Sequence, residues 1–188
     1  MKSKMVRKVV LSVKIYRKLN LLEDKKVIQN LNIAAIVVMV FCYILLLPLF
    51  NHDSVKTLPL LGELGALIVS LVVVVIIHEG IHGVFFKIFN FKGKVKFGFK
   101  NGMAYATSPG SMYRKWQFFI ISIAPFIIIT ILLLVIMNGW PYAWLRLLIA
   151  AHSGACAGDF YWCYLLLTTP KNLLVEDTEV GLTFHEVD

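Results

Sequence analysis

Two histidines and a glutamate lie close together in the segment His78-Glu79-Gly80-Ile81-His82, which has the spacing H-E-x-x-H. Residues four apart on a helix lie on one face, so both imidazoles can bind one metal ion. Glu79 lies about 100° around the helix from His78, where it can take a proton from a metal-bound water. Zinc suits imidazole and carboxylate ligands, and its catalytic sites keep an open position beside three protein ligands. The segment therefore predicts a hydrolytic zinc site with Glu79 as catalytic base.

Two other interpretations of these residues stay open. His78 and His82 could hydrogen-bond across a helix bundle, because polar side chains join helices in membranes. Glu79, His82, His152 and Asp159 could instead form the proton relay of a small transporter. A hydrogen-bonded bundle explains one histidine better than two at this spacing with a glutamate between them. The spacing therefore favours a metal.

The motif lies in a stretch that is apolar enough to cross a membrane. The composition is 59% hydrophobic and 16% charged, whereas soluble domains are about half apolar and about a quarter charged. Four stretches reach the ~20 apolar residues that span the hydrocarbon core: 31–50, 63–89, 117–138 and 141–168. We therefore expect an all-α membrane protein with four transmembrane helices and a small cytoplasmic β-hairpin between the second and third.

The basic residues predict how these helices are oriented. Residues 1–30 hold nine Lys/Arg against two acids, and residues 90–116 hold six Lys/Arg and no acid. This excess of positive charge predicts that the N-terminus, the 90–116 connection and the C-terminus are cytoplasmic in a multi-pass protein. The net charge of +8 is then explained by topology and by attraction to the lipid bilayer, and we expect no nucleic-acid partner.

A third ligand should come from another span at the same depth. Only Glu79 and Asp159 among the acids lie deep in apolar sequence, where an ionisable group costs about 2.5 kcal/mol or more. His78 and His82 lie 15 and 19 residues into the second span, and Asp159 lies 18 residues into the fourth. If both helices run the same way, all three lie about 22–28 Å from the outer ends. Asp159 is therefore the predicted third ligand.

Other side chains near Asp159 compete for this role. His152, Cys156 and Cys163 share its helical face. Thiolates bind zinc well, although a free cysteine is more often a small buried apolar residue. His152 should lie about 10 Å further out than Asp159, which suits a gating role or a supporting role behind the ligands. Asp159 itself could serve only in a hydrogen bond or a proton relay.

The parts outside the spans divide the chain into three predicted regions. Residues 1–30 form a basic cytoplasmic or interfacial segment, 31–168 the four-helix metal-binding domain, and 169–188 an acidic cytoplasmic tail. The connection at about 91–107 alternates apolar and basic residues around Asn101-Gly102, which predicts a hairpin. This hairpin could add a substrate as an extra strand, or it could lie on the lipid headgroups. The tail could form a strand against it, and we expect His185 there to be solvated.

These motifs resemble those of the zincin membrane peptidases, an uncharacterised bacterial family similar to the site-2 protease class of intramembrane metalloproteases. The resemblance covers roughly residues 25–187 and is strongest at HEGIHG and HSGACAGDFYW, with an IAPF segment between them. It implies zinc on His78 and His82, Glu79 as general base, and Asp159 in the position of the third ligand. The chain departs from the site-2 class in lacking an Asn-Pro-x-x-Asp-Gly stretch, because Asp159 lies between Gly158 and Phe160.

Together, these observations predict a zinc metalloendopeptidase of the bacterial cell membrane, with one zinc ion per chain. Glu79 would activate a zinc-bound water that hydrolyses peptide bonds near the cytoplasmic face. The expected partner is a protein or peptide substrate, membrane proteins included. The alternatives are a non-catalytic zinc-binding membrane protein and a small transporter or proton relay that uses the same ionisable residues.

Overall fold

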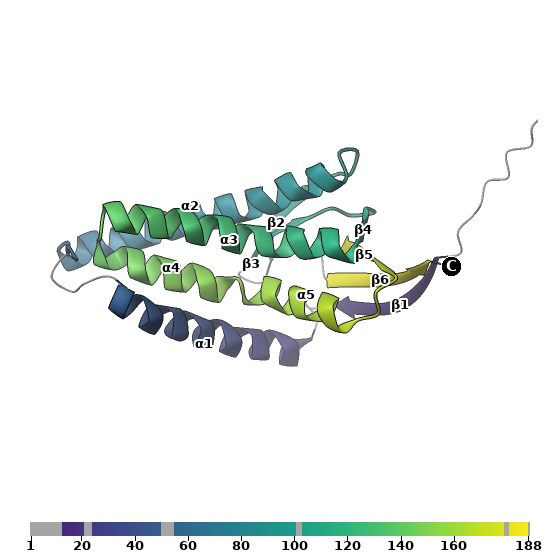
Figure 1. Cartoon of the computed structure of the whole chain (residues 1–188), viewed down its shortest axis with the longest axis horizontal. Coiled ribbons are helices and arrows are strands. Elements are labelled where there is room, and N and C mark those ends of the chain that lie inside the picture. The colour runs from purple at the N-terminus through teal and green to yellow at the C-terminus, as the bar shows by residue number, and fades with distance from the viewer. Residues whose placement is uncertain (1–12, 21–23, 50–54, 101–102, 179–180, 188) are drawn as a thin grey trace, which may run out of the picture.

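The computed structural model describes residues 13–20, 24–49, 55–100, 103–178 and 181–187. Its helices form an elongated bundle, and a sheet lies at one end of it (Figure 1). The helices are α1 (Lys25–Leu49), α2 (Leu60–Phe89), α3 (Lys115–Gly139), α4 (Ala143–Ala155) and α5 (Ala157–Thr168). The strands are β1 (Val13–Asn20), β2 (Lys96–Lys100), β3 (Met103–Thr107), β4 (Met112–Arg114), β5 (Leu173–Thr178) and β6 (Gly181–Val187).

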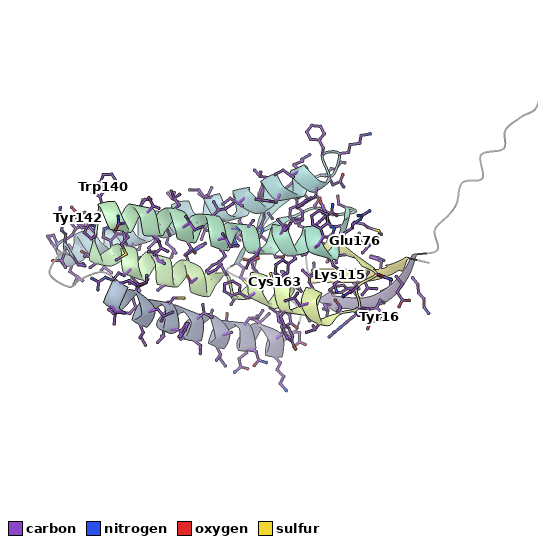
Figure 2. The ribbon with its side chains drawn as sticks, in the orientation of Figure 1. Tyr16, Lys115, Trp140, Tyr142, Cys163 and Glu176 are labelled. Carbon is purple, nitrogen blue, oxygen red and sulfur yellow. The ribbon has the colours of Figure 1, made fainter. Side chains whose placement is uncertain are left out.

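The three long helices α1, α2 and α3 are long and apolar enough to cross a membrane. Helix α1 begins where the Asp24 carboxylate accepts hydrogen bonds from the backbone N–H groups of Lys26 and Val27, at 3.0 and 3.2 Å, as an N-cap residue does. Many large apolar side chains of these helices are exposed, and they project outward from the bundle (Figure 2). Such an apolar exterior suits lipid and associates the protein with a membrane.

The prediction of an all-α fold with four transmembrane helices is wrong. Three helices in the described part of the chain qualify as membrane spans, and residues 141–168 form the shorter α4 and α5 instead. These two helices meet at Cys156, which lies in a turn between Gly154 and Gly158. Glycine disfavours helix by about 1 kcal/mol relative to alanine, so the same small residues that allow close packing also weaken the helix here.

Strands from both ends of the described chain form a four-stranded antiparallel sheet in the order β1-β6-β5-β4. Val175, Leu182 and Phe184 of this sheet are fully buried and pack with Phe86 and Phe118 at the ends of the long helices. The sheet is the second reason why the all-α prediction fails. Strands β5 and β6 follow each other in the chain, but β1 pairs with β6 across more than 150 residues and β4 pairs with β5 across about 60. No local pattern in the sequence reveals these two longer-range pairings.

The tail also differs from the prediction. Strand β6 pairs with β1 and β5, whereas the hairpin forms its own two-stranded sheet. His185 is 7% exposed rather than solvated, and its Nε2 lies 3.0 Å from the Glu176 carboxylate. The side chains of neighbouring strands therefore pair across the sheet at this position.

The predicted hairpin is present as β2 and β3, whose pairs run from Lys96–Thr107 to Lys100–Met103. Its Asn101-Gly102 turn lies outside the described residues. The hairpin rests on α2 at Gly83, where an added Cβ would lie 2.7 Å from the Phe97 ring. Gly83 therefore allows the close approach that holds β3 beside the motif on α2.

At the end of the bundle opposite the sheet, backbone hydrogen bonds join the segment before α2 to the connection between α3 and α4. The N–H of Lys56 donates to the Pro141 carbonyl at 2.8 Å, and the N–H of Ala143 donates to the Lys56 carbonyl at 3.0 Å. Trp140 and Tyr142 lie at this end (Figure 2). Aromatic residues of this kind favour the interface between lipid and water.

Helix α1 packs closely on α4 at Gly154, and substitution there should destabilise the fold. A Cβ at Gly154 would lie 2.6 Å from the Ala35 carbonyl oxygen and 3.0 Å from Met39 Cβ. Because the first contact is backbone, Gly154→Ala should cost about 1–3 kcal/mol of stability. Thermal unfolding in detergent measures this effect. Gly158→Ala is the matched control, since no atom lies within 4 Å of its added Cβ; an equal loss in both variants would contradict the prediction.

Candidate metal centre

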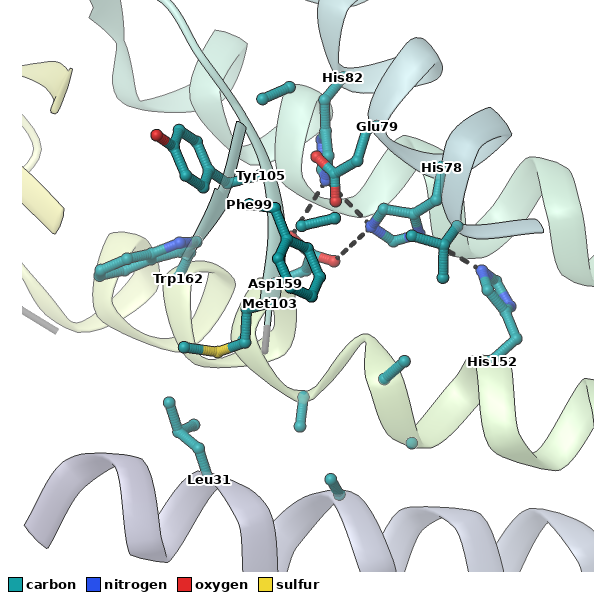
Figure 3. Close-up of a pocket in the computed structure, with 18 of the residues that line it drawn as sticks. Leu31, His78, Glu79, His82, Phe99, Met103, Tyr105, His152, Asp159 and Trp162 are labelled. Atoms are coloured by element: carbon teal, nitrogen blue, oxygen red, sulfur yellow. Dashed lines mark hydrogen bonds and ion pairs between the residues drawn. The ribbon is translucent and has the colours of Figure 1, made fainter. Parts of the chain in front are cut away.

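The structure brings His78 and His82 of α2 together with Asp159 of α5 (Figure 3). His78 Nε2 lies 3.1 Å from Asp159 Oδ2, and His82 Nε2 lies 3.3 Å from Asp159 Oδ1. The two Nε2 atoms are 3.1 Å apart. A tetrahedral zinc ion with bonds of 2.0–2.1 Å would separate such donor atoms by about 3.3 Å. These distances therefore fit three ligands of one ion.

The orientation of His82 is set by a hydrogen bond on its other nitrogen. His82 Nδ1 lies 2.8 Å from the carbonyl oxygen of Ile121 in α3. A carbonyl only accepts, so His82 carries its proton on Nδ1. In the neutral ring, Nε2 is then a bare acceptor that faces His78 and Asp159. Metal-binding histidines in proteins are commonly held by a bond of this kind.

Pro125 explains why the Ile121 carbonyl is available. In an α-helix the carbonyl of residue 121 would accept the N–H of residue 125, but proline has no N–H. The carbonyl is therefore free to accept the His82 proton across the helix interface. Sequence reasoning named this proline only as part of the IAPF segment, without a role. The signal available in the sequence was a proline inside an apolar helix, which leaves one known carbonyl without its partner.

His78 has its own supporting group. Its Nδ1 lies 3.4 Å from His152 Nε2 and 4.0 Å from Cys156 Sγ. With the His78 proton on Nδ1, His152 Nε2 accepts it, and His78 Nε2 is bare. His152 is 2% exposed and its ring stacks on Phe126 of α3, with the ring planes 13° apart. The supporting role of His152 stays a prediction, which this position beside His78 Nδ1 supports.

The donor set fits a cation. Two bare imidazole nitrogens and a carboxylate converge within 3.3 Å of one another, and none of these atoms carries a proton when both histidines are neutral. Three acceptors facing one another repel unless a positive charge lies among them. Two nitrogens and one carboxylate oxygen are also a ligand set that zinc uses in catalytic sites. The residues present therefore fit the zinc ion that the motif predicts.

Glu79 lies beside this group without belonging to it. It follows His78 on α2 (Figure 3), and the backbone of Ala106 in strand β3 lies close to its carboxylate. All four side chains line a cavity of about 500 Å³, a size typical of sites for small molecules and short peptide segments. The cavity extends between α1, α2, β3 and α5. Glu79 can therefore reach a water or a substrate that also lies against the three acceptors.

The other predicted candidates are placed as follows. Cys156 is buried beside His78 and His152, and these three residues form a second group of possible ligands. Cys163 is buried on α5, but within the described ranges it belongs to neither ligand group. The roles of His78, Glu79, His82 and Asp159 as ligands and base stay predictions, which their placement supports.

The function of Pro125 can be tested by restoring the missing N–H. Pro125→Ala should let the helix bond to the Ile121 carbonyl compete with His82 Nδ1, so that His82 is held less firmly. Loss of such a supporting hydrogen bond typically weakens metal binding about 10–100-fold, and competition with a chelating dye measures zinc affinity. Pro48→Ala in α1 is the control, because it too removes a proline from an apolar helix. Unchanged zinc affinity in Pro125→Ala would contradict the assignment.

Asp177 of β5 lines the same cavity from the sheet side. Burial raises the pKa of its carboxyl group from 3.8 to about 7, although the Ser108 N–H at 3.3 Å and the nearby His82 lower that pKa in part. The folded state then binds a proton that the unfolded chain has already released at pH 4–7. Stability should therefore fall as pH rises from about 4 to about 7.

The variant Asp177→Asn should remove this pH dependence. An amide does not ionise, so the free-energy cost of burying the side chain at position 177 is the same at high pH as at low pH. Thermal unfolding at about pH 5 and about pH 8 should show a smaller difference for Asp177→Asn than for the unchanged protein. Equal differences would show that other groups determine the pH dependence.

One comparison with known proteins identifies the family. A family model described as "Putative zincin peptidase" matches residues 71–174, which is more than half of the chain. No curated protein and no solved structure matches the chain, and the similarity to the site-2 class stays a prediction. The matched segment contains His78, Glu79, His82 and Asp159, and the description denotes zinc-dependent metallopeptidases. The chain therefore belongs to the "Putative zincin peptidase" family.

Proposed function

We propose that this protein is a membrane-embedded zinc metalloendopeptidase that holds one zinc ion per chain. The observation that carries the proposal is the convergence of His78 Nε2, His82 Nε2 and the Asp159 carboxylate beside Glu79. The family supports a metallopeptidase, and the apolar helices support its place in a membrane.

Each residue has a distinct part in the proposed reaction. His78, His82 and Asp159 hold the ion. Zinc, when bound there, supplies a Lewis acid that polarises a peptide carbonyl and lowers the pKa of water. Glu79 takes the proton of the attacking water and then delivers it to the leaving amine. Ile121 and His152 keep the two imidazoles in the orientation and tautomer that point both Nε2 atoms at the same place.

We propose a protein or peptide substrate that binds in an extended conformation along β3. Strand β3 pairs with β2 on one side, and its other edge has no strand partner among the residues that the structure describes. The Ala106 backbone already faces Glu79, and alternate residues of a strand direct their backbone groups to the same side. Ala104 therefore offers its backbone to the same edge. A substrate strand added there would pass Glu79 with its scissile carbonyl exposed.

We further propose that the site lies near the cytoplasmic face of a bacterial cell membrane, with lipid as the other partner and no nucleic acid. The sheet end of the bundle carries the strands from both chain ends and the 90–116 connection. The excess of Lys/Arg belongs to these same parts of the sequence, which supports a cytoplasmic position for them.

Metal removal tests the proposed function. The purified protein in lipid nanodiscs is incubated with a library of unstructured peptides and membrane-protein segments, before and after treatment with a zinc chelator. Cleavage should fall to the level of the blank on zinc removal and return when one equivalent of zinc per chain is restored. Cleavage that survives complete zinc removal, or a purified protein without stoichiometric zinc, would overturn the proposal.

A further inference from the structure

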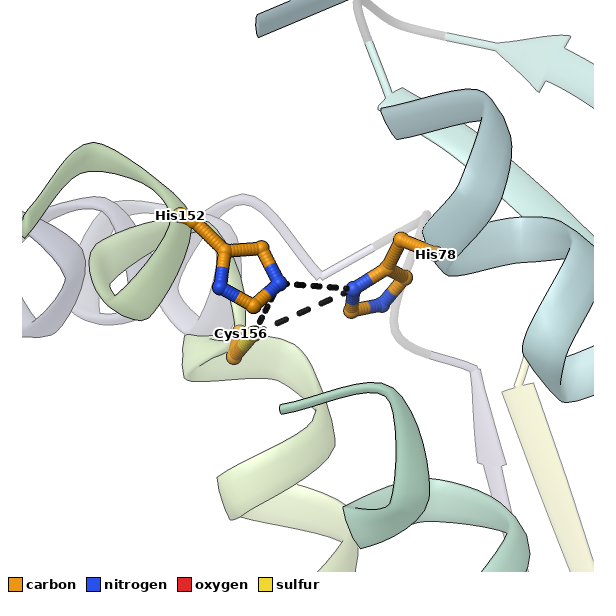
Figure 4. A group of neighbouring side chains, drawn as sticks. All are labelled: His78, His152 and Cys156. Atoms are coloured by element: carbon orange, nitrogen blue, oxygen red, sulfur yellow. Dashed lines mark hydrogen bonds between the residues drawn. The ribbon is translucent and has the colours of Figure 1, made fainter. Parts of the chain in front are cut away.

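We propose that His78, His152 and Cys156 form a second cation site, selective for a thiophilic ion and coupled to the first site through His78. The three side chains come from α2, α4 and the turn between α4 and α5. They face one another (Figure 4) on the Nδ1 side of the His78 ring, whereas Asp159 lies on its Nε2 side. The proposal concerns cation binding and does not depend on peptide hydrolysis.

The distances between the three donor atoms suit one ion. His78 Nδ1 lies 3.4 Å from His152 Nε2, and Cys156 Sγ lies 3.7 Å from His152 Nε2 and 4.0 Å from His78 Nδ1. A tetrahedral ion with 2.0–2.1 Å bonds to nitrogen and 2.3 Å bonds to sulfur would separate nitrogens by about 3.3 Å, and nitrogen from sulfur by about 3.6 Å. The observed set is within a few tenths of an ångström of this arrangement. Small side-chain rotations close the remaining difference.

The surroundings favour a thiophilic ion in particular. Cys156 is fully buried and His152 is 2% exposed, so little water competes with these two side chains for a bound ion. Among the residues that the structure describes, His152 Nδ1 has no hydrogen-bond partner, so a small shift of the ring toward an incoming ion breaks no bond at that nitrogen. A thiolate among imidazoles selects soft or borderline cations such as zinc and cadmium over magnesium or calcium. The ion can arrive through the cavity, because His78 and His152 both line it.

The shared histidine makes the two sites unequal. His78 uses Nε2 toward Asp159 and Nδ1 toward His152. If both nitrogens hold an ion, His78 releases its Nδ1 proton and Cys156 releases its thiol proton, so binding of the second cation releases two protons. Removing a proton from neutral imidazole is costly. The second ion should therefore bind more weakly than the first, and it also replaces the hydrogen bond by which His152 holds His78.

Cadmium titration of the purified full chain tests the assignment. Cadmium thiolates absorb in the ultraviolet, so the probe reports on sulfur ligation directly. The unchanged protein should take up two cadmium ions per chain, of which the weaker one produces the thiolate band. Cys156→Ser should bind one cadmium ion without that band. Cys42→Ser and Cys163→Ser are matched controls and should bind two ions with the band intact.

A variant of the first site separates the two sites. His82→Ala should lose the ion held with Asp159 and keep the thiolate band, since His78 Nδ1, His152 and Cys156 are unchanged. Cleavage is not measured, so failure of the peptidase proposal leaves this result interpretable. Retention of one ion by Cys156→Ser also shows that this variant folds. A thiolate band that persists in Cys156→Ser, or a single cadmium ion without any band in the unchanged protein, would overturn the second site.

Discussion

Peptide cleavage by the Glu79→Gln variant is expected to be about 10²–10⁴-fold slower than that of the unchanged protein, the range that a general base contributes. Zinc content should remain at one ion per chain. Glutamine preserves the size and shape of the side chain, but it cannot take the proton of water. The three acceptors that hold the ion are not altered. Single-turnover cleavage and metal analysis of the same preparation measure both quantities.

A second glutamate on α2 provides the control for this variant. Glu63 lies in the first turn of α2 and accepts the backbone N–H of Leu58 at 2.6 Å, far along the helix from the cavity. Glu63→Gln should therefore retain both zinc and cleavage. The alternatives predict different results for Glu79→Gln. A purely structural zinc site would have no cleavage to lose, and a proton relay would lose transport in a protein that contains no zinc.

The sequence predicted the local part of the site because one helix carries it. The spacing of His78 and His82 places both on one face through helix geometry alone. Asp159 required a second argument, the cost of an ionisable group in apolar sequence, and the structure places it beside the two histidines. The ligand role of Asp159 stays a prediction, but its predicted nearness to the two histidines is present although the assumed single helix is broken at Cys156, since α5 still carries Asp159 to the same place.

The parts that sequence reasoning missed depend on contacts between distant segments. The pairing of β1 with β6 could not be predicted from either segment. Apolar and polar residues alternate only weakly in each strand, and no turn sequence links one strand to the other. The bond from His82 to Ile121 is similar. Pro125 reveals that a carbonyl is free, but only the packing of α3 on α2 shows which side chain uses it. A membrane helix whose hydropathy is uniform gives no periodic signal for such packing.

Asp159→Asn is expected to lower zinc affinity strongly, because the variant changes a ligand itself. Loss of a group that only supports a ligand lowers metal affinity about 10–100-fold, and the loss in Asp159→Asn should be larger. Asparagine keeps the shape of the side chain and one carbonyl oxygen, but it removes the negative charge that both imidazoles face at 3.1 and 3.3 Å. Two neutral nitrogens then hold the ion without a charged partner. Competition with a chelating dye should show less than one zinc ion per chain under conditions where the unchanged protein is saturated.

The matched control for this variant is Asp177→Asn, which removes a carboxylate from the same cavity. Asp177 accepts the Ser108 N–H and belongs to neither of the two ligand groups in the described part of the chain, so zinc binding should be retained. If Asp159→Asn kept full zinc affinity and Asp177→Asn lost it, the third ligand would come from β5 rather than from α5. If both variants kept zinc, the two histidines would need another partner, and Cys156 would be the next residue to replace, because its sulfur lies 4.0 Å from His78 Nδ1.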